Sequence, residues 1–200
     1  MTRRLTLAEL PTDTVAMARF LIGRIVVRRL EDGLASGRVV ETEAYVPGDA
    51  ACHAYLRRTA RNASLFLSPG HAYVYRAYGR SWMLNVSSEA AGVGAGVLVR
   101  ALEPLEGIAL MRRNRGGAAL RDLARGPGRL AEALAIDRAL DGIDLCADTR
   151  LWLASDGATQ SEIAASVRIG ITKDADRVLR FFRPGSRFVS GPGWLNRPET

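Results

Sequence analysis

The sequence contains very little lysine and cysteine. Lys173 is the only lysine among 28 cationic residues, so arginine carries nearly all of the positive charge. Cys52 and Cys146 are far apart and form no Cys-x-x-Cys pair, which argues against a zinc site or an iron–sulfur cluster. His53 follows Cys52, but a metal needs further ligands close by. We therefore expect no metal, no other cofactor, and free thiols in a reducing compartment.

Long apolar runs are also missing. No stretch reaches the length of about 20 residues that a membrane-spanning helix needs, and residues 1–20 lack the unbroken apolar core of a signal peptide. The sequence shows no internal repeats and no low-complexity linker. These features exclude a membrane protein and a repeat array, and we expect a soluble, cytoplasmic protein.

The chain is basic and has enough apolar residues for one core. Its 200 residues are 48% hydrophobic, which suits a single domain over residues 1–200. The formal net charge is +7 and the pI is close to 10.2. This balance favours a polyanionic partner, most often nucleic acid, over an acidic small molecule.

Alternating and helical patterns predict short strands together with a few helices. Helices are expected over 11–23, 104–115 and 126–136, and strands over 24–30, 35–45, 96–104, 151–155, 167–172, 179–182 and 188–190. Residues 71–86 predict a β-hairpin with Gly79 in its turn. The pattern indicates an α+β fold, with a curved, mainly antiparallel sheet, surrounding helices and a protruding hairpin. Residues 46–70 form a long polar connection, and residues 191–200 are expected to be an irregular tail.

Two glutamates lie inside a predicted strand of this basic chain. In the segment VVETEAY, Glu41 and Glu43 are two residues apart and so share one strand face. Exposed strand faces carry acids for solubility, but a carboxylate in a cleft can also act as a general base. The pattern alone leaves both interpretations open.

Tyrosine, histidine and arginine gather in the middle of the chain. All five tyrosines lie between Tyr45 and Tyr78, both histidines lie in the same region, and arginines are frequent there. Aromatic rings interleaved with arginine suit an unstacked base held beside phosphates. Tyr73 is better read as a core residue, whereas Tyr78 at a hairpin tip is suited to wedge into a base stack.

A second anion site is suggested by the segment RGPGRL. Gly126, Pro127 and Gly128 lead into a predicted helix, so free backbone N–H groups can face a phosphate there. Arg125 and Arg129 flank the glycines. Gly-Pro is common before a helix, so the segment is also explained by a purely structural role at the start of the helix, without any bound phosphate.

Taken together, the motifs resemble those of the alkyladenine (3-methyladenine or alkylpurine) DNA glycosylase family, in its bacterial single-domain form. The matching pieces are GRVVETEAY, HAYLRRTARNASLF, SPGHAYVYRAYGRSWMLNVSS, VLVRALEPLEG and RGPGRLAEALAI, with VRIGIT and LRFF matching more loosely. They cover nearly the whole chain in order. The resemblance implies base excision repair, in which a damaged purine is flipped out of duplex DNA and its N-glycosidic bond is hydrolysed, leaving an abasic site.

The resemblance also implies roles for individual residues. Glu43 would hold and deprotonate the attacking water, and Arg100 would lie beside that water and keep Glu43 ionised. Glu41 is interpreted as a structural or supporting residue. The base pocket would be formed by Tyr45, His53, Tyr75 and Asn85, with Tyr78 intercalated into the duplex. Phosphate contacts are expected from Arg61, Arg80, Arg125, Gly128 and Arg129.

The single lysine bears on the chemistry. Glycosylases that also cut the strand usually form a Schiff base through an amine, and Lys173 lies in ITKDAD, which reads as a solvated turn away from the matching motifs. We therefore predict a monofunctional, monomeric enzyme acting on damaged duplex DNA, in the bacterial case near the nucleoid, without a required protein partner or membrane. Two alternatives remain: a non-catalytic damaged-DNA-binding protein of the same fold, and a hydrolase of small nucleosides.

Overall fold

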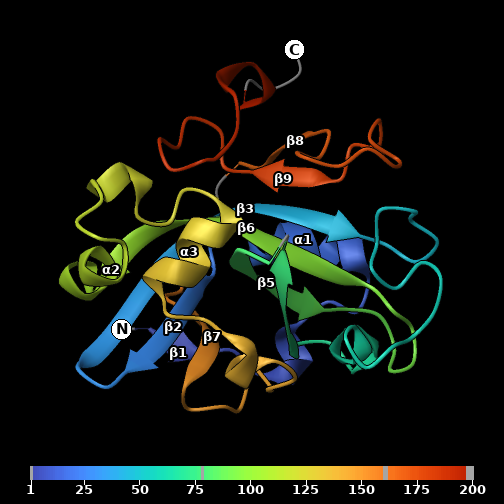
Figure 1. The fold of residues 1–200 in the computed structure, drawn as a ribbon, viewed down its shortest axis with the longest axis horizontal. Helices are drawn as coiled ribbons and strands as arrows, with labels where there is room; N and C mark the ends of the chain where they lie inside the picture. The colour runs from blue at the N-terminus through green and yellow to red at the C-terminus, as the bar shows by residue number, and fades with distance from the viewer. Residues whose placement is uncertain (1, 78, 160–161, 197–200) are drawn as a thin grey trace.

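One large antiparallel sheet organises the molecule (Figure 1). The structure is a computed structural model that describes residues 2–77, 79–159 and 162–196. Within this part of the chain the strands are β1 (Arg3–Arg4), β2 (Ile25–Leu30), β3 (Gly33–Tyr45), β4 (Ala72–Ala77), β5 (Ser81–Ser87), β6 (Gly96–Glu106), β7 (Leu151–Ser155), β8 (Ala164–Ser166) and β9 (Arg180–Phe182). The order is β1-β7-β2-β3-β6-β5-β4, and β9 pairs with both β3 and β8. The α+β prediction of a mainly antiparallel sheet is confirmed.

The helices are short and pack on the centre of the sheet. They are α1 (Thr14–Leu21), α2 (Ile108–Asn114) and α3 (Pro127–Ala133). The Asp13 side chain caps α1 by accepting a hydrogen bond from the Ala16 N–H, and Gly23 follows with a φ of 86°. α1 packs on β3 and β6, while α3 packs on β5 and β6. The main core lies between these elements.

Along one of its edges, strand β3 pairs with two different strands. Its first half pairs with β2, and the stretch from Glu41 to Glu43 pairs with β9, while β6 runs along the other edge. The pairing with β6 shifts register on both sides of Glu41. Such bulges bend a strand and re-aim its side chains. The glutamates are therefore placed where β3 leaves β2 and meets the C-terminal strands at the top of Figure 1.

Four predicted elements differ from the structure. Residues 104–106 belong to β6, so the expected helix begins only at Ile108. Residues 167–172 and 188–190 belong to no strand: the first segment bends at residues 169–170, where Gly170 has a φ of 77°, and Phe188 lies in a turn. The expected irregular tail contains a short 3-10 helix, Gly193–Asn196, before the end of the described residues.

Candidate active site

Glu43 is fully buried and is reached by three neighbours. Its Oε1 accepts a hydrogen bond of 2.7 Å from the Ile169 N–H, and its Oε2 accepts one of 3.0 Å from the Tyr45 hydroxyl. Arg100 Nη1 forms an ion pair with Oε2 at 3.1 Å. Tyr45, Arg100 and Ile169 all line one cavity, so the carboxylate lies directly behind the cavity wall.

Glu41 is buried as well and belongs to the same cluster. Its Oε1 accepts from Arg100 Nε at 2.9 Å and from Arg180 Nε at 2.7 Å, while Oε2 accepts from the Ser190 N–H at 2.7 Å. Burial opposes the charged form, but Arg100 and Arg180 together hold the pKa of Glu41 below its ordinary value. Glu41 is therefore no solubility residue, and its interpretation as a supporting residue agrees with these contacts.

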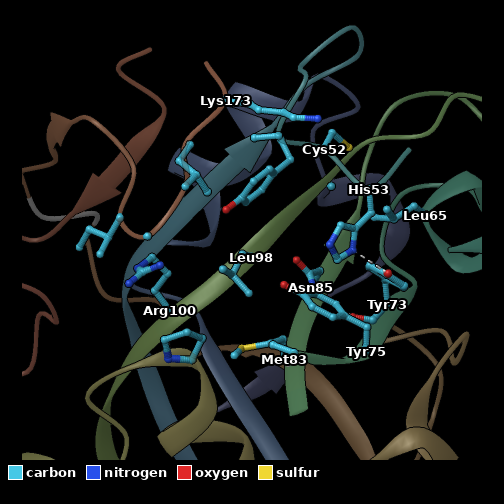
Figure 2. Close-up of a pocket in the computed structure, with 18 of the residues that line it drawn as sticks. Cys52, His53, Leu65, Tyr73, Tyr75, Met83, Asn85, Leu98, Arg100 and Lys173 are labelled. Carbon is cyan, nitrogen blue, oxygen red and sulfur yellow. Dashed lines mark hydrogen bonds between the residues drawn. The ribbon is translucent and has the colours of Figure 1, made fainter. Parts of the chain in front are cut away.

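The cavity has a volume of about 440 Å³, within the range typical of small-molecule sites. Strand β6 contributes Arg100, β5 contributes Asn85, and β4 contributes Tyr75. Figure 2 shows Arg100 on the opposite side of the cavity from His53 and Tyr75. The predicted pocket residues Tyr45, His53, Tyr75 and Asn85 do line this single cavity.

His53 is held in place from both its ring and its backbone. Its ring packs edge-on against Tyr73 and Tyr75, and its Nδ1 lies 2.9 Å from the Tyr73 hydroxyl. The Asn62 side chain donates to the His53 carbonyl at 2.8 Å, which orders the long connection before β4. Partial burial, with a smaller contribution from Arg61, lowers the pKa of His53. The ring is therefore neutral at pH 7.

Tyr45 is supported from behind by a buried cation. The guanidinium of Arg168 lies over the Tyr45 ring at 4.7 Å from its centroid and forms a fully buried ion pair with Asp49. Burial and the nearby Glu43 raise the pKa of Tyr45, so its hydroxyl keeps its proton and donates. The other side of the pocket is fixed by Asn85, whose Nδ2 donates to the Tyr73 carbonyl at 3.1 Å.

The structure corrects the placement of Lys173. The side chain is exposed, as expected, but it lines the same cavity as Tyr45 and Arg100 (Figure 2). The sequence placed it away from the matching motifs because ITKDAD reads as a solvated turn, although the loosely matching VRIGIT ends at residue 172. Tyr78, the expected intercalating residue, lies outside the described residues.

The predicted phosphate contacts fall into two groups. Arg61 and Arg80 are exposed, and Arg61 lines a second cavity that shares His53 and Tyr75 with the first. Arg125 and Arg129 are engaged within the protein: Arg125 Nε donates to the Val189 carbonyl at 2.8 Å, and Arg129 pairs with Asp122.

Gly128 has a packing role that the sequence did not indicate. A Cβ at this position would lie 2.9 Å from the Ser81 Cβ, so glycine lets α3 approach β5 closely. The helix has seven residues, Pro127–Ala133, and Pro127 at its start lines the main cavity. The segment therefore joins α3 to the cavity wall.

Four residues of the site escaped the sequence-based prediction. Tyr73 was assigned to the core and is buried, but its hydroxyl also contacts His53. Ile169 acts through its backbone, which no side-chain motif reveals. Arg168 and Arg180 are buried arginines in VRIGIT and LRFF, and arginine within an apolar strand-like run was the available signal.

No group of three or more His, Cys, Asp or Glu among the described residues could hold a metal ion. Within the same part of the chain, no helix is long and apolar enough to cross a membrane. Cys52 and Cys146 are free thiols.

Comparison with known proteins identifies the relatives. The family model for methylpurine-DNA glycosylase (MPG) matches residues 8–187. A protein of Mesorhizobium japonicum, named as a candidate 3-methyladenine DNA glycosylase, is 67% identical over 185 residues, or 92% of this chain and 89% of that protein. A relative with the same name from Paraburkholderia phytofirmans is 52% identical over 184 residues, or 92% and 86%. The DNA-3-methyladenine glycosylase of Mus musculus is 44% identical over 194 residues, or 88% and 58%.

Proposed function

Because the chain belongs to the methylpurine-DNA glycosylase family and is a hydrolase of N-glycosyl bonds, we propose that it excises alkylated purines of the 3-methyladenine type. The substrate is damaged duplex DNA, and the damaged purine is flipped into the 440 Å³ cavity. The observation that carries this proposal is the buried Glu43, paired with Arg100 behind a wall of aromatic side chains.

Glu43 has acceptor capacity to spare for a water. A carboxylate offers about four acceptor positions. Ile169 uses one on Oε1, while Tyr45 and Arg100 both approach Oε2, so the second position on Oε1 is left for a water. The carboxylate is fully covered by its neighbours. Tyr45 is the neighbour that gives way when a nucleotide enters, because it is only partly buried while Arg100 is held by Glu41.

The chemistry then follows from charge. As the glycosidic bond breaks, positive charge develops at the sugar C1′, and the Glu43 carboxylate stabilises it while taking a proton from the water. Arg100 keeps Glu43 ionised through the ion pair at 3.1 Å. Water adds to C1′, the base leaves with the electrons of the glycosidic bond, and an abasic sugar remains.

The aromatic rings that line the cavity suit lesions that are already cationic. Among the described residues, no Asp or Glu lines it, and its ionisable side chains are those of arginine, lysine, histidine, tyrosine and cysteine. A cationic alkylated purine leaves as a neutral base without being protonated. The flipped base stacks between Tyr45 on one side and His53 with Tyr75 on the other, where electron-rich rings attract a cation. Asn85 crowds the position of a guanine amino group.

Release of free base from methylated DNA by the purified chain tests the proposal. Wild type is compared with Glu43→Gln and with Glu103→Gln, a glutamate on β6 whose side chain is one-third exposed beside Arg183. We expect methylated adenine from wild type and Glu103→Gln, and at least about 100-fold slower release from Glu43→Gln. If every variant binds damaged DNA but none releases a base, the chain is a non-catalytic damage-binding protein.

The enzyme is further proposed to be monofunctional and to act as a monomer. Lys173 lines the cavity, so an amine is within reach of the site, and the experiment must address it directly. Borohydride is added during turnover of lesion DNA by wild type and Lys173→Ala. We expect no covalent adduct with either protein; an adduct that forms with wild type and disappears in Lys173→Ala would show strand-cutting chemistry.

A further inference from the structure

Arg100 lies between two buried carboxylates and uses different nitrogens for each. Its Nε donates to Glu41 Oε1 at 2.9 Å, and its Nη1 approaches Glu43 Oε2 at 3.1 Å. An arginine and a single carboxylate prefer a two-pronged contact, with two parallel hydrogen bonds to both oxygens. Both two-pronged geometries of an arginine use Nη2, together with either Nε or Nη1. Here Nε is held by Glu41 and Nη2 lies near the Ser190 hydroxyl, so only Nη1 faces Glu43 and the two-pronged contact does not form.

Glu41 is in turn fixed by a fully satisfied arginine. The guanidinium of Arg180 is not exposed, and all five of its N–H donors have acceptors. Nε donates to Glu41, Nη1 to Ser166 and to the Leu195 carbonyl, and Nη2 to the Ser190 carbonyl and to Asn196.

Residues 190–196, near the C-terminus, hydrogen-bond to Glu41 and to the two arginines. The Ser190 N–H donates to Glu41 Oε2 at 2.7 Å, and its hydroxyl lies 3.4 Å from Arg100 Nη2. The Asn196 side chain donates to the Ser190 carbonyl and accepts from Arg180. Residues 190–196 therefore contact Glu41 and both of its arginine partners, Arg100 and Arg180, but they do not line the main cavity.

We propose that Glu41 is a positioning residue which, braced by Arg180 and residues 190–196, keeps Arg100 from closing with both prongs on Glu43. The brace leaves the second acceptor position on Glu43 Oε1 open for the attacking water. This inference rests on the proposed function and adds to it a set of residues that contact neither the base nor the sugar. Without the brace, Arg100 forms both hydrogen bonds with Glu43, and the carboxylate loses the positions that a water needs.

A charge-balanced double variant tests the brace without leaving a buried ion alone. Glu41→Met with Arg180→Met removes one negative and one positive charge, and apolar replacement of a buried pair often preserves stability. The matched control is Arg38→Met with Asp156→Ala, which removes an ion pair elsewhere on the sheet. A third variant, Glu41→Asp, retains a carboxylate that is one methylene shorter.

The rate of base release is measured under single turnover with saturating enzyme, and the affinity for lesion DNA is measured separately. We expect the double variant to be about 100-fold slower with an affinity within about twofold of wild type, since a misplacement near 1 Å has such an effect on rate. Glu41→Asp should recover part of the rate, and the control pair should match wild type. A folded double variant with the wild-type rate would overturn the proposal.

A crystal structure of the double variant provides the second readout, and it does not depend on activity. We expect Arg100 to make two hydrogen bonds to Glu43, one to each oxygen. An Arg100 that keeps its wild-type position would refute the brace whatever the rates are. If wild type itself releases no base, the proposed function fails, and the crystal structure still decides whether Glu41 holds Arg100.

Discussion

The hydroxyl of Tyr73 contacts the ring of His53, and Tyr73→Phe removes this hydroxyl alone. The oxygen lies 2.9 Å from His53 Nδ1, while the Tyr73 ring stacks on Tyr75 with centroids 5.3 Å apart. Burial, followed by the neighbouring Tyr75, raises the pKa of Tyr73, so the hydroxyl keeps its proton and can donate. We expect it to donate to Nδ1 of the neutral imidazole, which places the ring proton on Nε2 as a donor to the purine edge.

The magnitude follows from the loss of one hydrogen bond in a partly exposed site. A net contribution of about 0.5–1.5 kcal/mol corresponds to roughly 2- to 12-fold in affinity. We expect Tyr73→Phe to weaken binding of lesion DNA by this factor, with a smaller change in the rate of base release once the base is bound. The affinity is measured by fluorescence anisotropy in the Glu43→Gln background, which stops turnover.

The two histidines make the tautomer directly observable by NMR. His71 Nδ1 lies 2.9 Å from the Ser68 carbonyl, so His71 carries its proton on Nδ1 and serves as an internal control. The pKa of His53 lies below its ordinary value because of burial and Arg61. If Tyr73 donates to the neutral ring, Tyr73→Phe raises the pKa of His53. A fall in that pKa, or a wild-type proton on Nδ1 of His53, would refute the donor assignment.

Three further predictions concern stability and binding. Asp49→Asn leaves the buried Arg168 without its charge partner, which should lower the free energy of unfolding by about 3–5 kcal/mol and the melting temperature by about 6–20 °C. In a calorimetric scan, the double variant Asp49→Leu with Arg168→Met should recover much of the lost melting temperature. The hydrogen bond from Arg38 lowers the pKa of Asp156 to about 2, so its stabilising effect is present above pH 3.8 and is lost as the pH falls toward 2. Asp156→Asn should therefore flatten the acid unfolding curve in that window; an unchanged curve contradicts the assignment. The dissociation constant for DNA should rise steeply with salt, and a flat log–log plot would argue against binding through phosphates.

Local signals predicted most of the sheet and the first helix. The Asp13 cap and Gly23 bound α1, and the turn predicted at residues 31–33 does join β2 to β3, with Gly33 as the first residue of β3. The hairpin of β4 and β5 also pairs as predicted. These elements are determined by residues a few positions apart, so the sequence pattern is sufficient to find them.

The two segments wrongly predicted as strands reveal what local patterns miss. Residues 167–172 and 188–190 are rich in β-branched and other apolar residues, which is why they read as strands. Their backbone bonds to the site instead: the Ile169 N–H donates to Glu43, and the Ser190 N–H donates to Glu41. The acceptors are carboxylates more than a hundred positions away in sequence, so no periodicity in the segment itself points to them. The misplacement of Lys173 has the same cause, because it follows one of these segments.

The brace around Arg100 also determines when the enzyme becomes active during synthesis. Glu41 cannot form its hydrogen bonds with Arg180 and Ser190 until those residues, which follow it by 139 and 149 positions, have been synthesised. The hairpin and its neighbouring arginines leave the ribosome long before those partners. A chain that ends before residue 180 therefore lacks both of these partners of Glu41, and its Arg100 has no brace.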